Sequence, residues 1–228
     1  MKQFVAVLLI LIASIACART PSAIPTGVWN YRLLVNGAPI GKATVSNKKE
    51  GTRYITSVEM EIDAGTVKNR TRQTVTETLD FRPISLEVYQ YTSQNGQITE
   101  MTTKADYDGS VIRLDAGGKK SEVRIEKPFV FEGNFFMHSL IEKGFAPGTV
   151  VQHYIYEPLV DIEEPTMVLV KVVGKERISV NGRARELIHL GYTIENLKNI
   201  DEWIDERGIS VKTVITMLNN RLELILED

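Results

Sequence analysis

The chain has 228 residues, of which 43% are hydrophobic, and its 27 lysines and arginines nearly balance its 29 aspartates and glutamates. The formal net charge of −2 and the absence of a basic block argue against nucleic acid as a partner. Cys17 is the single cysteine, so the chain cannot form an internal disulfide or a thiolate metal site. This length fits one large β domain or two small ones, and it is enough to bury a stabilising core.

The first 16 residues are typical of a bacterial secretory signal. Lys2 supplies the positive start, residues 4–15 contain no charge, and Ala16 is the small residue at the exit. The apolar run is shorter than the roughly 20 residues that cross a bilayer as a helix. We therefore predict export and removal of residues 1–16.

Cys17 follows this signal, at the position where bacterial lipoproteins are diacylated and cleaved. Ile15 and Ala16 resemble the lipobox that precedes such a cysteine, whereas Ser14 departs from its usual leucine. We predict that Cys17 carries acyl chains of the palmitate type and anchors the protein to the periplasmic side of a membrane. Ala18 differs from the aspartate that retains Gram-negative lipoproteins in the inner membrane, which favours the outer membrane. The alternative is ordinary cleavage after Ala18, which leaves a soluble periplasmic protein.

The next segment is typical of a linker. Residues 17–26 contain two prolines and have little apolar surface to bury. We expect a lipidated tether over 17–26, followed by a single β-rich domain over 27–228.

The first half of this domain alternates apolar and polar residues, as strands with one buried face do. The pairs Asn36-Gly37 and Asn95-Gly96 are typical of tight hairpin turns. The segment 67–81 is rich in threonine and arginine, which is compatible with a strand although polar. We expect strands over 27–35, 39–46, 54–64, 67–81, 84–91, 98–107, 111–114 and 122–126. Their spacing predicts an antiparallel meander.

Residues 132–144 interrupt the strands with a helical pattern. Asn134 is a suitable N-cap, and Gly144 can take the left-handed conformation that ends a helix. Phe135 lies outside the apolar arc, so it packs against the preceding loop as a staple residue or faces a groove or ligand. The apolar arc itself holds Phe136, Met137, Leu140 and Ile141.

Strand patterns resume after the helix. In 167–173 and 209–218 apolar residues occupy both faces, which indicates that both faces are covered. A sheet of ten or more antiparallel strands must curl, split or close. The sequence thus predicts a mainly β (α+β) fold: a strongly curved antiparallel sheet, a half-barrel or roll, with one main helix packed on its concave side. The later strands are expected over 150–157, 167–173, 185–194, 200–205, 209–218 and 221–227.

Short motifs occur in a fixed order along the domain. They are Trp29-Asn30-Tyr31-Arg32-Leu33, Asn36-Gly37-Ala38-Pro39-Ile40-Gly41, Phe81-Arg82-Pro83-Ile84, the segment 142–149, Val180-Asn181-Gly182-Arg183-Ala184 and Glu202-Trp203-Ile204-Asp205-Glu206-Arg207-Gly208. With them the chain resembles a family of exported bacterial β-proteins of unknown function, similar to domains that precede transglutaminase-like domains in longer chains. The resemblance implies a bent-sheet fold of the lipoprotein-carrier kind and no reaction, and it carries over no catalytic residue.

The residues that could support catalysis form no recognisable motif. The chain has three histidines, which we expect in structural roles: His138, His153 and His189. Ser139 follows His138, but adjacent helical residues point about 100° apart and cannot form a nucleophile–base pair. The sequence has no Gly-x-Ser-x-Gly, His-Glu-x-x-His or glycine-rich phosphate-loop motif.

Two acidic segments could suggest a metal site. Residues 157–164 lack the spacing and the glycine of a calcium loop, so a solvated turn is expected there in preference to calcium. The acidic residues of 201–206 are expected at the exposed ends of a hairpin. We therefore expect no catalytic residue, no metal and no cofactor.

These features favour a non-enzymatic cell-envelope lipoprotein whose curved sheet binds a hydrophobic ligand such as a lipid or acyl chain. The apolar helix arc and the two-sided strands are the expected lining of that ligand site. The alternative is an envelope scaffold or protein-interaction module with a filled core and an exposed sheet edge, and a hydrolase ranks third. The expected partners are the membrane, through Cys17, and a lipid ligand, while protein partners stay open.

Overall fold

The computed structural model describes residues 24–194, 200–217 and 220–227. Within these residues fifteen strands form one sheet, in the order β8-β7-β6-β5-β4-β3-β2-β1-β15-β14-β13-β12-β11-β10-β9. The predicted signal 1–16, Cys17 and most of the tether lie outside the described residues.

The first half of the chain contributes eight strands. They are β1 (Gly27–Val35), β2 (Ala38–Glu50), β3 (Arg53–Asp63), β4 (Val67–Thr78), β5 (Pro83–Gln94), β6 (Gln97–Tyr107), β7 (Ile112–Ala116) and β8 (Lys119–Val123). The second half contributes a helix and the remaining strands. They are β9 (Phe129–Val130), α2 (Asn134–Glu142), β10 (Val150–Ile155), β11 (Thr166–Val180), β12 (Arg183–Ile194), β13 (Ile200–Ile204), β14 (Ser210–Met217) and β15 (Asn220–Leu226).

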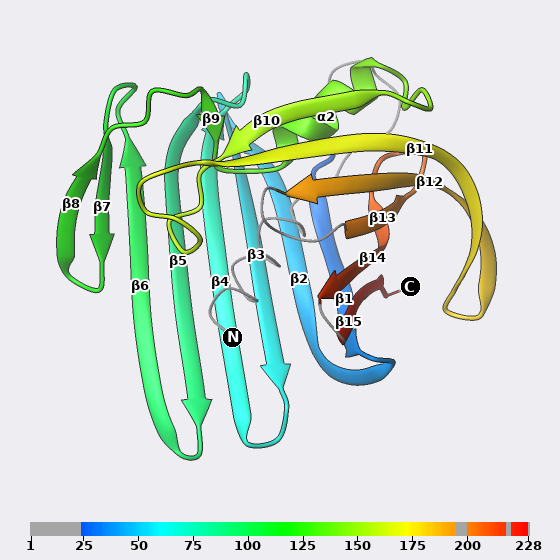
Figure 1. The fold of residues 1–228 in the computed structure, drawn as a ribbon, viewed down its shortest axis with the longest axis horizontal. Coiled ribbons are helices and arrows are strands. Elements are labelled where there is room, and N and C mark those ends of the chain that lie inside the picture. Colours follow the sequence, from blue (N-terminus) through cyan, green and yellow to red (C-terminus); the bar gives the residue numbers. More distant parts are fainter. Residues whose placement is uncertain (1–23, 195–199, 218–219, 228) are drawn as a thin grey trace.

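Strands β1 to β8 form an antiparallel meander of long hairpins (Figure 1). The tight turns are where the sequence places them, with φ of 51° and 83° at Asn36 and Gly37 and of 51° and 81° at Asn95 and Gly96. Such turns need positive φ at both central residues, which asparagine and glycine adopt at the lowest steric cost.

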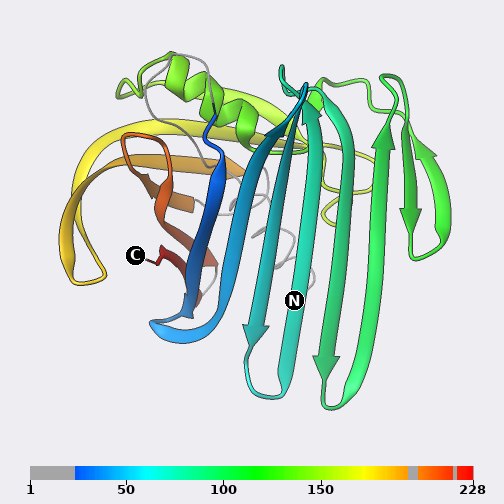
Figure 2. The same ribbon diagram turned by 180° about the vertical axis from the view of Figure 1, so that it is seen from behind.

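Strands β1 to β7 of the meander have one buried face and one face toward solvent, whereas β8 at the sheet edge has no buried residue. In β3, for example, Val58 and Met60 are buried, while Asp63 is exposed and Glu59 and Glu61 are half-buried. We call the face of β1–β8 that is turned toward β9–β15 the inner face, and the opposite face the outer face. Figure 2 views the molecule from the side of the outer face.

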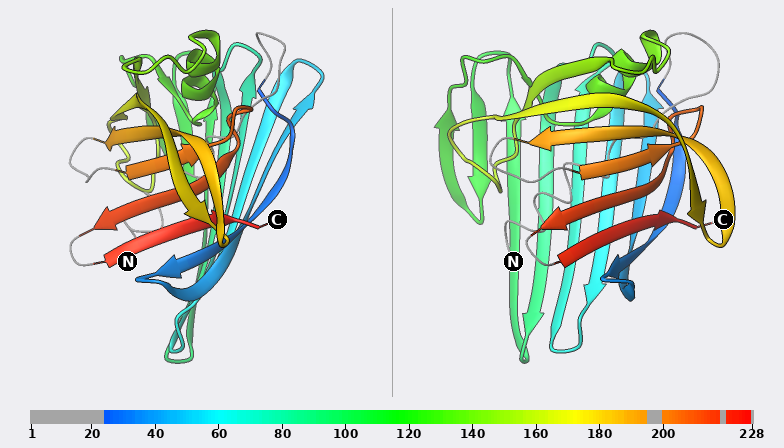
Figure 3. Two further views of the ribbon diagram at one scale, coloured as in Figure 1. Left: turned by 90° about the vertical axis from the view of Figure 1, so that its right-hand side faces the viewer. Right: turned by 45° about the vertical axis from the view of Figure 1, so that its right-hand side comes forward.

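The second half of the sheet curls back across the inner face of the first half (Figures 1 and 3). The curl is possible because β1 pairs antiparallel with β15, with Tyr31 opposite Leu226 and Val35 opposite Leu222. The first and last strands of the domain therefore join the two halves of the sheet. Buried residues of both halves form one hydrophobic core between the layers, including Leu33, Val58 and Leu86 from the first half and Val170, Leu190 and Leu224 from the second.

The helix α2 covers one end of this core, at the start of β1 and the end of β2 (Figure 2). Phe136, Met137 and Leu140 are at most 2% exposed and belong to the core, as the apolar arc predicts. Gly144 ends the helix with a φ of +62°, and its backbone N–H donates to the Ile141 carbonyl at 2.9 Å.

The expected N-cap was wrong by one residue. Gly133 is the N-cap and makes no side-chain capping bond, and Asn134 is the first helical residue. Its amide is directed into the core instead, because buried acceptors lie there. Phe135 is half-buried against the core, and its ring centroid lies 4.3 Å from that of His153 in β10.

The prediction of two covered faces is correct for β14 and incomplete for β11. Val211 is fully buried against Val180 and Leu187, which come from the bent end of the β11–β12 hairpin. This hairpin end, and not the helix, covers the second face of β14. On β11, by contrast, Val173 is 51% exposed, because the outside of that strand faces solvent.

The fold class is thus confirmed as a mainly β, strongly curved open sheet with one helix among the described residues. None of the helical segments in the described ranges is both long and apolar enough to cross a membrane.

Candidate ligand-binding site

The inner face of β2–β7 is built from rows of side chains in register across neighbouring strands. The first row, on the α2 side, is apolar over β4–β7 and joins Val75, Leu86, Ala105 and Leu114. The second row joins Val58, Gln73, Val88 and Thr103. The third row joins Met60, Thr71, Gln90 and Met101, and the fourth joins Ile62, Asn69, Thr92 and Thr99.

Burial decreases from the α2 end toward the tips of the β3–β4 and β5–β6 hairpins. The first two rows are buried throughout. In the third row Gln90 and Met101 are half-buried, and in the fourth row Thr99 is exposed. We call the hairpin-tip side the open end of the inner face and the α2 side its closed end. Toward the open end the rows change from aliphatic side chains to amides and hydroxyls, and none of their members is charged.

Two buried side-chain oxygens in the second row have no hydrogen-bond partner within the described part of the chain. The Gln73 side chain is 1% exposed and its Oε1 is unpaired, and the Thr103 side chain is 3% exposed and its Oγ1 is unpaired. Nearer the open end the polar groups are satisfied: Asn69 Nδ2 donates to Thr92 Oγ1 at 2.9 Å, and Thr71 Oγ1 donates to Asn69 Oδ1 at 3.0 Å. Because an unmade buried hydrogen bond is costly, the two unpaired groups are a notable feature of this wall.

A buried polar cluster occupies the closed end. Asn134 Nδ2 donates to Glu77 Oε1 at 2.6 Å and contacts Thr56 Oγ1 at 3.0 Å. The Thr56 hydroxyl donates to Asn47 Oδ1 at 3.2 Å, and Asn47 Nδ2 donates to the Pro25 carbonyl at 2.9 Å. This chain of bonds connects the start of α2 with β2, β3, β4 and the point where the polypeptide enters the domain.

Three buried carboxyl groups belong to this end. Glu77, Glu132 and Glu157 are each at most 2% exposed. Burial raises the pKa of Glu77 and of Glu157 to about 7, and burial raises the pKa of Glu132 further above its ordinary value, aided by the charges of the other two. A protonated carboxyl is a neutral hydrogen-bonding group, so this cluster carries little charge below neutral pH.

The acidic segment 157–164 is therefore only partly the solvated turn that was expected. Glu157 is buried, and its Oε1 accepts from the Leu159 N–H at 3.1 Å. Asp161 Oδ1 accepts from the backbone N–H groups of Glu163 and Glu164, which is ordinary turn chemistry. The described residues contain no group of three or more His, Cys, Asp or Glu side chains able to hold a metal.

The hairpin segment 201–206 also departs from expectation at one residue. Glu202 is 1% exposed and faces the core, where the Tyr192 hydroxyl donates to its Oε2. Burial raises the pKa of Glu202 to about 7. The neighbouring Tyr31 hydroxyl donates to the Ser210 carbonyl at 3.1 Å. The strand alternation of β13 places Glu202 inward with Ile200 and Ile204.

The three histidines contact carboxylates and aromatic rings. His138 Nδ1 lies 3.7 Å from Glu142 Oε2, and its ring lies 5.0 Å from that of Phe81. His153 stacks near Phe135, and burial lowers the pKa of His153. His189 lies between two carboxylates, with Nε2 2.8 Å from Asp201 and Nδ1 3.2 Å from Glu176.

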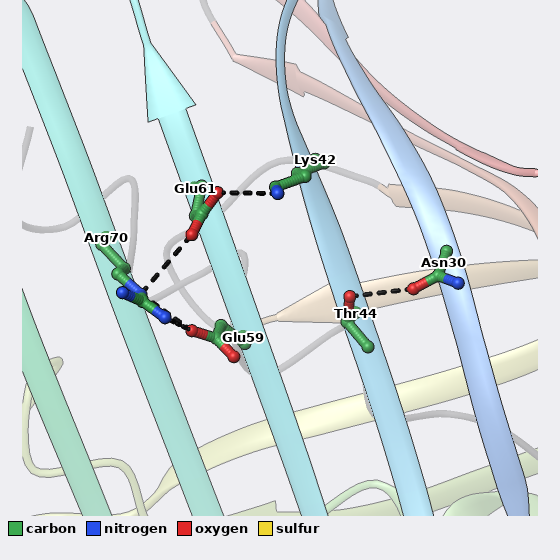
Figure 4. Close-up of polar contacts among 6 residues, drawn as sticks. All are labelled: Asn30, Lys42, Thr44, Glu59, Glu61 and Arg70. Carbon is green, nitrogen blue, oxygen red and sulfur yellow. Dashed lines mark hydrogen bonds and ion pairs between the residues drawn. The ribbon is translucent and has the colours of Figure 1, made fainter.

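The outer face has different chemistry: its strands carry ion pairs and tyrosines. Arg70 Nε donates to Glu59 Oε1 at 2.8 Å and lies 3.6 Å from Glu61, whose Oε2 pairs with Lys42 at 3.0 Å (Figure 4). On the two neighbouring strands Thr44 Oγ1 donates to Asn30 Oδ1 at 2.9 Å. A shallow groove of about 650 Å³ lies over β2–β6, and its lining includes Lys42, Glu61 and Arg70 together with Tyr89, Tyr91 and Glu100.

Comparison with known proteins supports the fold and leaves the chemistry open. No protein-family model and no curated protein matches the sequence. A solved structure is similar: the beta-barrel-like protein of domain of unknown function DUF1849 from Brucella abortus, at 12% identity, covers 88% of this chain and 95% of its own, with a TM-score of 0.63. A DUF1089 family protein from Pseudomonas aeruginosa aligns over 85% of this chain and 92% of its own at 11% identity, with a TM-score of 0.34 that supports no argument.

The first of these similarities shows a shared fold among β-rich proteins of unknown function. It agrees with the resemblance to an uncharacterised β-protein family, although nothing in it concerns transglutaminase-like domains. At 12% identity it transfers no ligand and no residue role.

The sequence-predicted site residues are placed as follows. Cys17 lies outside the described residues. The helix residues Phe136, Met137 and Leu140 lie at the closed end of the inner face. The unpaired Gln73 and Thr103 were not predicted. For Gln73, the segment 67–81 carried a signal: its polar residues occupy both the odd-numbered and the even-numbered positions of the strand. Because alternate residues point to opposite faces, some of these polar residues must face inward.

Proposed function

We propose that the protein is a non-enzymatic cell-envelope lipoprotein, anchored in the outer membrane through acylated Cys17, that binds a hydrophobic ligand against the inner face of its sheet. The observation that carries this proposal is the gradient along the inner face, from buried aliphatic rows at the closed end to half-buried, uncharged rows at the open end. An acyl chain needs aliphatic walls, and its polar group needs uncharged donors and acceptors. Without acylation the same domain would act as a soluble periplasmic carrier.

The arrangement of the layers supports this proposal. The two halves of one sheet face each other, and buried residues of both contribute to the same apolar core. The side of this core away from α2 is the direction from which a ligand would enter, because the inner residues there are half-buried or exposed. Met60 and Met101 lie in the third row, and methionine side chains adapt to ligands of variable shape.

The test is the binding of an apolar fluorescent probe, N-phenyl-1-naphthylamine, to the purified mature protein. We expect about one probe per molecule, displaced by a lipid extract of the envelope. Met101→Trp should reduce the probe signal strongly, because it adds bulk to the inner face at the open end. Thr102→Trp is the matched control, since the adjacent residue points to the outer face and should leave binding unchanged.

Two outcomes of the probe experiment would contradict the carrier proposal. If the folded wild-type protein binds no probe below the concentration at which it aggregates, the carrier proposal is wrong. Equal loss of binding in both tryptophan variants would assign the probe to non-specific sites and would also contradict the proposal.

A second candidate is a protein-interaction module, and the outer-face groove favours it. This groove has half-buried tyrosines, Tyr89 and Tyr91, beside paired charges, a combination common in polar interfaces. Arg70→Glu would reverse a charge in the groove and should abolish pull-down of an envelope partner without changing probe binding. The two candidates therefore predict losses in different variants.

A further inference from the structure

Gln73 and Thr103 lie on either side of Val88 in the second row of the inner face. The register of β4, β5 and β6 places Gln73 opposite Val88 and Val88 opposite Thr103. Each of the two polar side chains is buried and has an unpaired oxygen, Gln73 Oε1 and Thr103 Oγ1. The two oxygens therefore form a pair of polar groups separated by one apolar strand.

The distance between the two strands limits what can contact both groups. β4 and β6 are two strand spacings apart, about 10 Å in a sheet. Two hydroxyls on neighbouring carbon atoms, with a hydrogen bond of about 2.8 Å at each end, span most of that distance, and the long Gln73 side chain can cover the rest. The carbon atoms between the hydroxyls would contact Val88.

The side chains around Gln73 and Thr103 favour an uncharged ligand group. The four inner rows contain aliphatic, amide, hydroxyl and thioether side chains, with no lysine or arginine to pair an anion and no acid to pair a cation. Arg70, Arg72 and Lys104 of these strands are exposed on the opposite face, whereas Glu77 of β4 is buried at the closed end, beyond the four rows. A charged group in the second row would lose its hydration without a counter-charge, which is strongly unfavourable.

We propose that Gln73 and Thr103 bind the polar group of the ligand, and that the ligand is a neutral amphiphile whose acyl chain is linked to a hydroxyl-bearing group. This inference rests on the proposed function and adds the ligand class and two recognition residues to it. Hydroxyls suit the site because one can donate to Gln73 Oε1 and another can either donate to or accept from the Thr103 hydroxyl. The acyl chain would lie against the aliphatic row beyond, toward α2.

The experiment compares two probes with the same chain in displacement of N-phenyl-1-naphthylamine. 1-Monooleoylglycerol has two hydroxyls on neighbouring carbons, whereas methyl oleate has no hydrogen-bond donor. We expect the wild-type protein to bind monooleoylglycerol about tenfold more tightly, the size of effect expected from one or two net hydrogen bonds. In the double variant Gln73→Leu, Thr103→Val this ratio should fall to about one, with methyl oleate binding unchanged.

These substitutions should not unfold the protein, because they replace unpaired buried polar groups with apolar ones of similar shape. Thr74→Val on the adjacent outer-face position is the control and should preserve the tenfold ratio. Equal binding of the two probes by wild type, or a ratio that persists in the double variant, overturns the inference while leaving the carrier proposal intact. Binding of neither probe by wild type overturns the carrier proposal itself.

Discussion

The acidic side chains of this protein divide into two populations with opposite effects on stability. Exposed carboxylates such as Asp63 and Asp80 accept hydrogen bonds from side chains beside them, which lowers their pKa values. Glu77, Glu157 and Glu202 are buried without a cationic partner, and burial raises the pKa of each to about 7. In the unfolded chain these carboxyls ionise near 4.5. The folded state therefore holds its protons to higher pH than the unfolded state does.

The consequence is a stability that decreases as pH rises. Below about pH 4.5 the raised pKa values contribute their full stabilisation, and this contribution is lost as the pH passes through about 7. Each of the three carboxyls accounts for about 3 kcal/mol over that range. We expect the urea midpoint of the wild-type domain to fall clearly between pH 5 and pH 8.

Single substitutions test which carboxyl groups cause this pH dependence of stability. Glu77→Gln keeps an acceptor for Asn134 Nδ2 and cannot ionise, so the midpoint should depend less on pH and be higher than wild type at pH 8. Glu186→Gln, at a site whose side chain is 67% exposed, is the control and should leave the slope unchanged. A wild-type midpoint that is flat or rises over this range would show that the carboxyls are ionised in the folded protein.

At the scale of elements, α2 contributes to the fold through its packing and hardly through its caps. Its N-cap Gly133 makes no side-chain hydrogen bond, its first turn has no acidic residue, and its last turn has no basic residue. A nine-residue helix with so little terminal stabilisation is not stable in isolation. Its apolar arc against the sheet is what holds it in place.

Leu140 tests that statement. The side chain is fully buried, so Leu140→Ala should reduce the free energy of unfolding by about 2–5 kcal/mol. Lys143→Ala, at an exposed position of the same helix end, should change it by less than about 0.5 kcal/mol. Chemical denaturation of the two variants measures both values. Equal stability of Leu140→Ala and wild type would show that α2 is not part of the core.

At the scale of the whole molecule, the polypeptide enters the domain beside α2, at the closed end of the inner face. Ile24 is 2% exposed, and the Pro25 carbonyl is held by Asn47. Cys17 precedes Ile24 by seven residues, a fully extended reach of at most about 25 Å. An acylated Cys17 would therefore keep the closed end near the membrane surface, and the open end could point away from it.

The anchor is tested by phase partitioning of protein expressed in a bacterial host. Wild type should enter the detergent phase of Triton X-114, and Cys17→Ser should move to the aqueous phase, because the serine cannot be diacylated. The unfolding midpoint of the domain should be the same for both, since Cys17 precedes the first strand, which begins at Gly27. A wild-type protein that is fully aqueous and begins at Arg19 would establish ordinary signal cleavage.

The features that the sequence determined by itself are local. The turns at Asn36-Gly37 and Asn95-Gly96, the alternation in β3 and the apolar arc of α2 all follow from backbone sterics and side-chain periodicity within a few residues. These effects do not depend on distant contacts, so they can be recognised in the sequence. The curled sheet was predictable from them, because many antiparallel strands cannot remain flat.

The candidate site was decided by the tertiary structure. Glu132 and Glu157 follow the paired strands β9 and β10, and the curl of the sheet places them at the same buried end as Glu77 of β4. In the same way, the pairing of β1 with β15 joins the strands of the domain that are farthest apart in the sequence. Whether Gln73 or Thr74 faces inward depends on register, and a shift of one residue exchanges every side chain between the faces. Register is fixed by the free energy of burying one face of the whole sheet. No short segment of the sequence determines that free energy.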